Sequence, residues 1–199
     1  MTDILTSIHG RLVGLDKDEY LTTPVGVKVP ALYIGTSGSE TQLTATATEL
    51  NRAADASGRI VSVTTSALSV TEAAHDSKTI VLNKATGSVT VTLPAATGSG
   101  TRLRVLVGTT KTSSSYIIKT SSATQFMAGT VVTAKDSTDQ VNAWEAASTA
   151  GRISLNGSTK GGLKGDWFEL EDVASALWIV RGQTQATGTE ATPFSSAIA

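Results

Sequence analysis

The stretch Ser88-Val89-Thr90-Val91-Thr92-Leu93 alternates apolar and hydroxyl residues one by one. Successive side chains of a β-strand point to opposite faces of the sheet, so a period of two is typical of a strand with one buried face. Pro94 ends the alternation, and Thr97-Gly98-Ser99-Gly100 supplies the small and polar residues that turns prefer. We therefore predict a half-buried strand at this position, followed by a turn.

The same pattern returns on both sides of this stretch. Arg102-Leu103-Arg104-Val105-Leu106-Val107 is the next clear case. Further strands are expected at 60–64, 79–82, 116–120, 125–133, 141–147, 152–155, 166–170 and 177–181. Short strands spaced by roughly ten residues with turns between them are typical of a sandwich or a barrel. We predict an all-β fold, with a single β-sandwich or jelly-roll-like domain over residues 59–182, and a barrel fits the same pattern.

The core of this domain must rest mainly on Val, Ile, Leu and Ala, because aromatic residues make up only 5% of the chain. Trp167-Phe168 and Trp178-Ile179-Val180 lie in the last two expected strands and should anchor that core. Trp144 also falls within a strand pattern. We expect all three tryptophans to be core residues.

Residues 1–43 hold short apolar pieces broken by turns, and we expect an extended N-terminal arm with short hairpins there. Pro24 and Pro30 flank the alternating run Val25-Gly26-Val27-Lys28-Val29. Proline donates no hydrogen bond to a sheet ladder, so this run suits an edge strand or an arm that lies on a neighbouring subunit.

We predict one convincing helix, a short connector over residues 44–58. Thr46 and Glu49 have the spacing of a capping box, and Gly58 suits its end. Residues 183–199 lose the alternation and should form a C-terminal tail, either loosely ordered or packed on a neighbour. Phe194 and Ile198 favour packing on a neighbour.

The composition excludes several classes of function. The 199 residues include no cysteine, which removes disulfides, zinc–cysteine sites and thiol catalysis. The net charge is −1 and no run of Lys or Arg occurs, which disfavours nucleic acid as a partner. We expect neither a signal peptide nor a membrane span.

Charged residues make up 17% of the chain, below the roughly 25% of an average soluble domain. Two explanations fit this low value. The faces of the domain are buried against other subunits, or the surface is solvated by Thr and Ser.

The candidate catalytic residues are few. His75 is followed by Asp76, and a carboxylate that orients an imidazole is half of a hydrolytic triad. However, neighbours on a strand point to opposite faces, and no glycine–serine nucleophile elbow occurs. His9 is expected at a surface or interface. We predict no catalytic site, no cofactor and no enzyme activity.

Two acidic groups are candidate calcium ligands. Asp16, Asp18 and Glu19 lack the spacing and the distal glutamate of a calcium loop, so a hairpin turn is the better interpretation. Asp136 and Asp139 are similarly interpreted as a loop pair. We predict no metal site.

Gly157-Ser158-Thr159-Lys160-Gly161-Gly162 resembles a phosphate loop only superficially, because the Gly-Lys-Ser/Thr ending and the following helix are missing. We interpret it as a turn between strands. Glu169, Glu171 and Asp172 are expected to form a polar rim or an interface salt-bridge surface. Arg102 and Arg104 should face solvent or an acidic patch of a partner.

Several stretches resemble structural proteins of tailed bacteriophages. Leu43-Thr44-Ala45-Thr46-Ala47-Thr48-Glu49-Leu50-Asn51-Arg52-Ala53-Ala54-Asp55 resembles a connector that recurs in such proteins. Leu93-Pro94-Ala95-Ala96-Thr97-Gly98-Ser99-Gly100 resembles a segment of head-decoration and fibre-like proteins. Residues 155–167 and 188–194 are similar to C-terminal parts of the same group.

The resemblance implies a virion structural protein that decorates and stabilises the outer surface of a phage capsid by bridging major capsid subunits. It also implies a homo-oligomer, often a trimer, assembled in the host cytoplasm. A dimer with swapped arms fits the composition equally well. The alternative is a tail-fibre, head-fibre or baseplate appendage that binds host-surface polysaccharide, which the connector helix and the Thr/Ser/Asn-rich loops favour.

Overall fold

The computed structural model describes residues 32–34, 41–44, 49 and 57–196. The chain divides into two compact units, residues 1–53 and 54–199. In the first unit, β1 (Leu32–Ile34) pairs antiparallel with β2 (Thr41–Leu43). The expected hairpin turn at Asp16, the valine run 25–29 and most of the connector helix lie outside the described residues.

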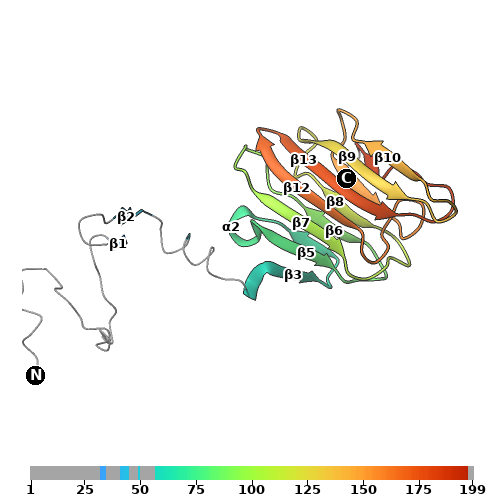
Figure 1. Cartoon of the computed structure of the whole chain (residues 1–199), viewed down its shortest axis with the longest axis horizontal. Helices are drawn as coiled ribbons and strands as arrows, with labels where there is room; N and C mark the ends of the chain where they lie inside the picture. Colours follow the sequence, from blue (N-terminus) through green and yellow to red (C-terminus); the bar gives the residue numbers. More distant parts are fainter. Residues whose placement is uncertain (1–31, 35–40, 45–48, 50–56, 197–199) are drawn as a thin grey trace, which may run out of the picture. The chain divides into compact units, whose positions relative to one another are not determined.

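The second unit is a sandwich of two sheets (Figure 1). The larger sheet has seven strands in the order β10-β9-β13-β12-β7-β5-β3, and the smaller has five in the order β14-β11-β8-β6-β4. The larger comprises β3 (Ile60–Val63), β5 (Lys78–Leu82), β7 (Arg102–Val107), β9 (Phe126–Ala134), β10 (Val141–Glu145), β12 (Trp167–Ala174) and β13 (Leu177–Gln185). The smaller comprises β4 (Ala67–Ser69), β6 (Val89–Thr92), β8 (Tyr116–Lys119), β11 (Arg152–Leu155) and β14 (Phe194–Ser195). The predicted all-β sandwich is confirmed.

Consecutive strands from β3 to β8 alternate between the two sheets. Within the larger sheet β3, β5 and β7 run parallel, and within the smaller sheet β4, β6 and β8 do the same. This half of the domain is therefore a flattened coil. The other half adds antiparallel neighbours, with β12 between β7 and β13, and β11 between β8 and β14.

The core lies between the two sheets, and the alternation of the sequence decides which residues enter it. In β6, Val89 and Val91 are buried while the threonines are only partly covered. In β7, Leu103, Val105 and Val107 are buried while Arg102 and Arg104 are exposed. Each large apolar side chain buried in this way stabilises the fold by about 1.5–3 kcal/mol. Trp178 and Phe168 are fully buried, as expected of core anchors.

Two short helices lie in the described part of the second unit. η1 (Ser57–Arg59) leads directly into β3, and α2 (Glu72–His75) joins β4 to β5. Neither α2 nor the three-residue β4 was expected, because both are too short to show a period. No helix among the described residues is long and apolar enough to cross a membrane.

The end of the chain differs from the expected tail. β13 continues to Gln185, and Phe194 belongs to β14, which pairs with β11 of the same domain. Phe194 is 7% exposed and packs in the core. The prediction that Phe194 packs on a neighbour is therefore wrong, because the apolar side chain completes the molecule's own smaller sheet. Ile198 lies outside the described residues.

Candidate functional site

An open groove of about 430 Å³ lies on the outer face of the larger sheet, over β5, β7, β12 and β13. The alternation of the strands places charged side chains there. Arg102 and Arg104 flank the buried Leu103, and Glu169 and Glu171 flank the buried Leu170. Four cations and two carboxylates line the groove, so positive charge is in excess: Lys78, Arg102, Arg104, Arg181, Glu169 and Glu171.

The strand register sets opposite charges side by side in the groove. Glu169 lies opposite Arg104 on β7 and Arg181 on β13. Glu171 lies opposite Arg102 and, on the other side, Ile179. Directly opposed residues of neighbouring strands have Cβ atoms about 4.5–5.5 Å apart, within reach of each other's long side chains.

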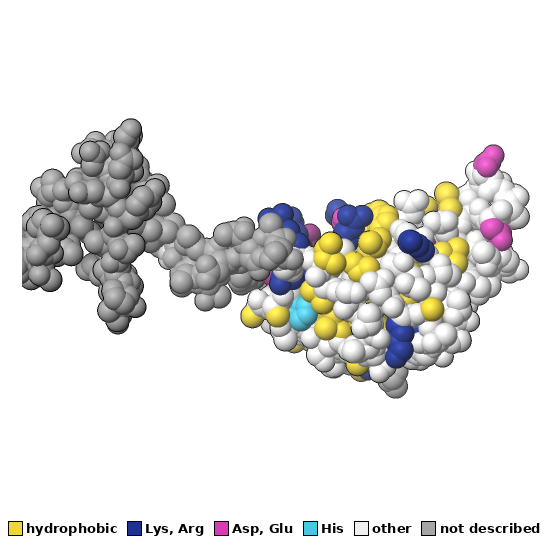
Figure 2. All heavy atoms as spheres, turned by 90° about the horizontal axis from the view of Figure 1, so that it is seen from below, with side chains coloured by type: hydrophobic (Ala, Val, Ile, Leu, Met, Phe, Trp, Pro, Cys, Tyr) yellow, Lys and Arg dark blue, Asp and Glu magenta, His cyan; other side chains and the backbone are white. Residues whose placement is uncertain are grey.

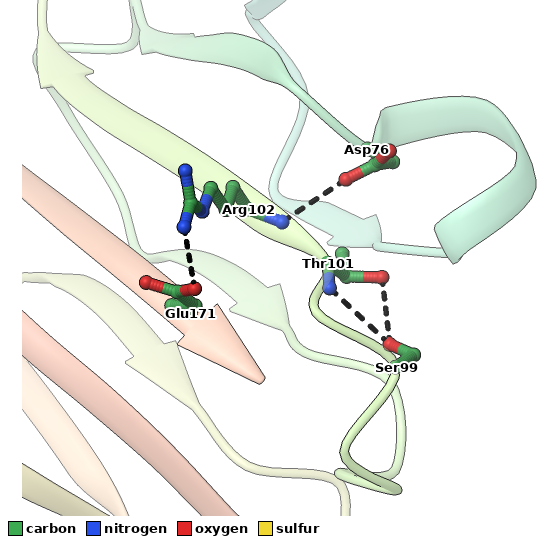
Figure 3. A network of polar contacts seen from close by, with 5 residues as sticks. All are labelled: Asp76, Ser99, Thr101, Arg102 and Glu171. Carbon is green, nitrogen blue, oxygen red and sulfur yellow. Dashed lines mark hydrogen bonds and ion pairs between the residues drawn. The ribbon is translucent and has the colours of Figure 1, made fainter. Parts of the chain in front are cut away.

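Arg102 contacts Asp76 through its backbone and Glu171 through its side chain (Figure 3). The Asp76 Oδ1 atom accepts a hydrogen bond from the Arg102 backbone N–H at 3.0 Å. The guanidinium Nη2 lies 2.8 Å from Glu171 Oε1, and the two side chains are 71% and 36% exposed. An ion pair this exposed stabilises the fold by about 0–1 kcal/mol. This ion pair lies within one sheet, so the predicted interface salt-bridge surface stays a prediction.

Arg104 stacks on an aromatic ring beside the groove. Its guanidinium carbon lies 5.4 Å from the centroid of the Trp167 ring. Trp167 is partly exposed on the outer face of β12, so the prediction that all three tryptophans are core residues is wrong for this one. Trp167 shares its face with Glu169, whereas the core residue Phe168 has the opposite orientation. Trp144 is partly buried, and its indole N–H donates to Thr133 Oγ1 at 3.0 Å.

Figure 2 shows how charge is spread over one side of the domain. Most of the surface is neutral, as the low charged content indicates. The Lys and Arg groups in this view are spread over the left and the middle of the described domain, with hydrophobic side chains between them. Two separate acidic groups lie at its right-hand end.

His75 and Asp76 are not placed as the histidine and carboxylate of a catalytic triad. His75 ends α2 rather than lying on a strand, and its Nδ1 is 3.1 Å from the backbone N and O atoms of Thr71. Asp76 instead holds the backbone of Arg102. His9 lies outside the described residues.

The other sequence candidates also have local structural roles. Asp136 Oδ2 accepts the Gly188 N–H at 3.2 Å, and among the described residues no group of three or more His, Cys, Asp or Glu is placed to hold a metal ion. Residues 157–162 form a turn between β11 and β12, as expected. Asp16, Asp18 and Glu19 lie outside the described residues.

Two buried carboxylates position the loops around these strands, and sequence reasoning assigned neither role. Asp172 was expected on a polar rim, but it points inward from β12 and is fully buried. Asp166 accepts the N–H groups of Gly162, Leu163 and Gln185 at 2.7, 3.1 and 2.8 Å. Burial raises the pKa of Asp166, and these hydrogen bonds offset only part of the rise. A single aspartate in a strand gives no sequence signal that it faces inward.

Lys111 is the one buried cation in the part of the chain that the structure describes. Its Nζ donates to the carbonyls of Lys84 and Gly87, and lies 4.3 Å from the centroid of the Tyr116 ring. Burial, reinforced by the nearby charge of Lys84, lowers the pKa of Lys111. Two of its three N–H donors bind the chain's own carbonyls, so Lys111 links its own loop to the segment that holds Lys84 and Gly87.

We expect Tyr116→Phe to lower the free energy of unfolding by about 1–2 kcal/mol, because a buried hydroxyl is lost from its partners. Tyr116 Oη donates to the Thr109 carbonyl at 2.8 Å and accepts the Lys84 N–H at 3.2 Å. Urea unfolding followed by tryptophan fluorescence measures the effect. An unchanged midpoint would show that water replaces both contacts.

The sequence was compared with protein-family models and with curated proteins, and no match was found in either comparison.

Proposed function

We propose that this chain is a virion structural protein that decorates the outer surface of a phage capsid and stabilises it by bridging major capsid subunits. The observation that carries the proposal most is the kind of surface the domain offers. The outer face of its larger sheet carries an open, charge-lined groove, a surface that suits contact with another protein chain. The class of protein that we propose comes from a resemblance to phage structural proteins, which residues 43–55, 93–100, 155–167 and 188–194 carry.

The described residues add a second line of support. His75 and Asp76 are directed to separate backbone partners, and the buried Lys111 and Asp172 form hydrogen bonds with the chain's own groups. These groups are used to build the domain. A homo-oligomer, with a trimer favoured, is part of the proposal because the resemblance implies it. Burial of faces against other subunits is also one of the two explanations of the charged content of 17%.

We expect a chain that lacks residues 1–30 to lose attachment to capsids while its β-domain stays folded. The proposed reason is that the N-terminal arm makes the contact with the shell. Capsids purified without this protein are mixed with full-length or truncated chain, and bound protein is counted after sedimentation. Equal melting temperatures of the two chains serve as the control for folding. Attachment of the truncated chain at full occupancy would refute the role of the arm.

The second candidate is an appendage protein that binds host-surface polysaccharide, and the partly exposed Trp167 favours it. Sugar rings stack on exposed aromatic faces. One face of Trp167 is already in contact with the guanidinium of Arg104. Glycan-array binding that Trp167→Ala abolishes would favour this candidate over capsid decoration.

A further inference from the structure

The hairpin of β9 and β10 ends in an exposed acidic tip. We define the tip as residues 136–140, which are all exposed. The Lys135 N–H donates to the Gln140 carbonyl at 3.2 Å and closes the loop. Asp136 and Asp139 supply its two carboxylates. Val141 beside the tip is 62% exposed, and Val132 on β9 is 37% exposed.

The tip is held in place by the C-terminal segment. Asp136 Oδ2 accepts the Gly188 N–H at 3.2 Å, and Lys135 Nζ lies 4.0 Å from Glu190 Oε2. The Ala186 N–H donates to the Ala134 carbonyl at 3.1 Å. A surface held by such contacts loses little conformational freedom when it binds, which favours binding.

The groove matches this tip in charge and in polarity. Arg104 and Arg181 are exposed on either side of Glu169, Lys78 adds a third cation, and Ile179 offers apolar surface on the same strand as Arg181. With the Arg102–Glu171 ion pair set aside, three cations face one carboxylate, so the groove stays positive. Its volume of about 430 Å³ falls within the roughly 300–1,000 Å³ of ligand pockets. In the view of Figure 2, two separate acidic groups lie at one end of the domain, away from the Lys and Arg groups.

The tip cannot reach the groove of its own molecule. β9 pairs with β13 from Phe126 to Ala134, and β10 pairs with the other edge of β9. The hairpin is thereby held in the same sheet whose outer face bears the groove. A contact between them needs a second copy of the chain.

We propose that the β9–β10 hairpin tip of one copy binds in the basic groove of a second copy. Asp139 of the tip approaches Arg104 and Arg181, and Val141 packs towards Ile179. Each copy carries both surfaces, so the contact is heterologous and joins copies into a ring where the rotation closes. The inference rests on the homo-oligomer in the proposed function and not on attachment to a capsid.

Sedimentation equilibrium of the full-length protein tests the contact with charge reversals. Wild type is expected to self-associate, and to do so more weakly at about 0.5 M salt because exposed charge pairs are screened. Asp139→Lys and Arg104→Glu are each expected to weaken self-association about tenfold or more, whereas the double variant restores it. Lys164→Glu, in an exposed loop outside the groove, is the matched control and should have no effect.

Circular dichroism confirms that each variant is folded, so a loss of association reports on the contact. A monomeric wild type, single variants that associate as wild type does, or a double variant without rescue would each overturn the inference. A wild-type monomer whose Arg104→Glu variant loses capsid binding would assign the groove to the capsid instead. Because capsid binding is assayed separately, failure of the self-contact and failure of the decoration function give different results.

Discussion

Gly129→Ala is expected to lower the melting temperature of the protein by about 6–20 °C, since a domain of this size loses about 2–4 °C for each kcal/mol. Gly129 lies within β9 and has φ of +135°, a conformation that side-chain-bearing residues rarely adopt. A Cβ atom there would lie 1.9 Å from the carbonyl oxygen of Val180 on β13. The obstacle is backbone, so it cannot turn away as a side chain does.

Two costs add in this substitution. Backbone strain at a left-handed position costs about 1–3 kcal/mol, and forcing packed strands apart costs a similar amount. The parallel pairing of β9 with β13, opposite Val180, is where the strain falls. We therefore expect a loss of about 3–5 kcal/mol, a large share of the roughly 5–15 kcal/mol that holds a domain folded.

Gly100→Ala is the matched control for Gly129→Ala. Gly100 also has a positive φ, +76°, but a Cβ atom there would meet nothing within 4 Å. This variant should show the backbone strain alone, about 1–2 kcal/mol. Equal losses for the two variants in thermal unfolding would contradict the close approach of β9 to β13.

The second large effect is expected for Asp172→Asn, with a loss of about 2–3 kcal/mol in the free energy of unfolding. The carboxylate accepts the N–H groups of Thr97, Gly98 and Ser99 at 2.9, 2.8 and 3.1 Å, and the Ser99 hydroxyl at 2.9 Å. Asparagine keeps one acceptor and turns an NH₂ group towards these donors. The loop itself is exposed, so water replaces part of what is lost.

This substitution should also change the response of stability to acid. Burial by itself raises the pKa of Asp172, but the hydrogen bonds from residues 97–99 outweigh it and leave the pKa below its usual 3.8. A depressed pKa in the folded state means that the stabilisation is complete above the unfolded-state pKa and disappears as the pH falls through the folded-state value. The difference in stability between wild type and Asp172→Asn should therefore shrink below about pH 4.

Asp166 is present in both proteins, and its raised pKa gives stability a pH dependence of the opposite sign in each. The difference between the two proteins therefore reports on Asp172. Urea unfolding at a series of pH values measures the difference. Glu171→Gln, one residue away in an exposed ion pair, is the control and should cost about 0–1 kcal/mol at any pH. A wild-type advantage over Asp172→Asn that stays constant down to pH 2 would contradict the assigned pKa direction.

The period-two pattern predicts the individual strands well. Val89 and Val91 enter the core and Arg102 and Arg104 stay outside, because alternation alone decides which face a residue occupies. Pairing partners leave no such trace in the sequence. The parallel coil from β3 to β8 depends on which strands meet after long connections, and neither spacing nor composition reveals that.

The site was predictable only in part. The alternation predicted Arg102 and Arg104 on an exposed face, and Glu169 and Glu171 were predicted on a polar rim as part of an acidic cluster. The structure joins all four into one groove because β7 and β12 are neighbours. Asp172 shares the acidic cluster with Glu171 in sequence yet points inward, because it is the next residue along the strand. Its loop partners lie more than seventy residues earlier, which a local pattern does not reach.

The proposed capsid-decoration function predicts how many copies of this chain a particle contains. A protein that bridges major capsid subunits over the whole shell must be present in a fixed ratio to them. We would measure its copy number relative to the major capsid protein in purified particles by quantitative mass spectrometry. We predict hundreds of copies in a constant ratio, whereas a few copies per particle, or none, would contradict the proposed function.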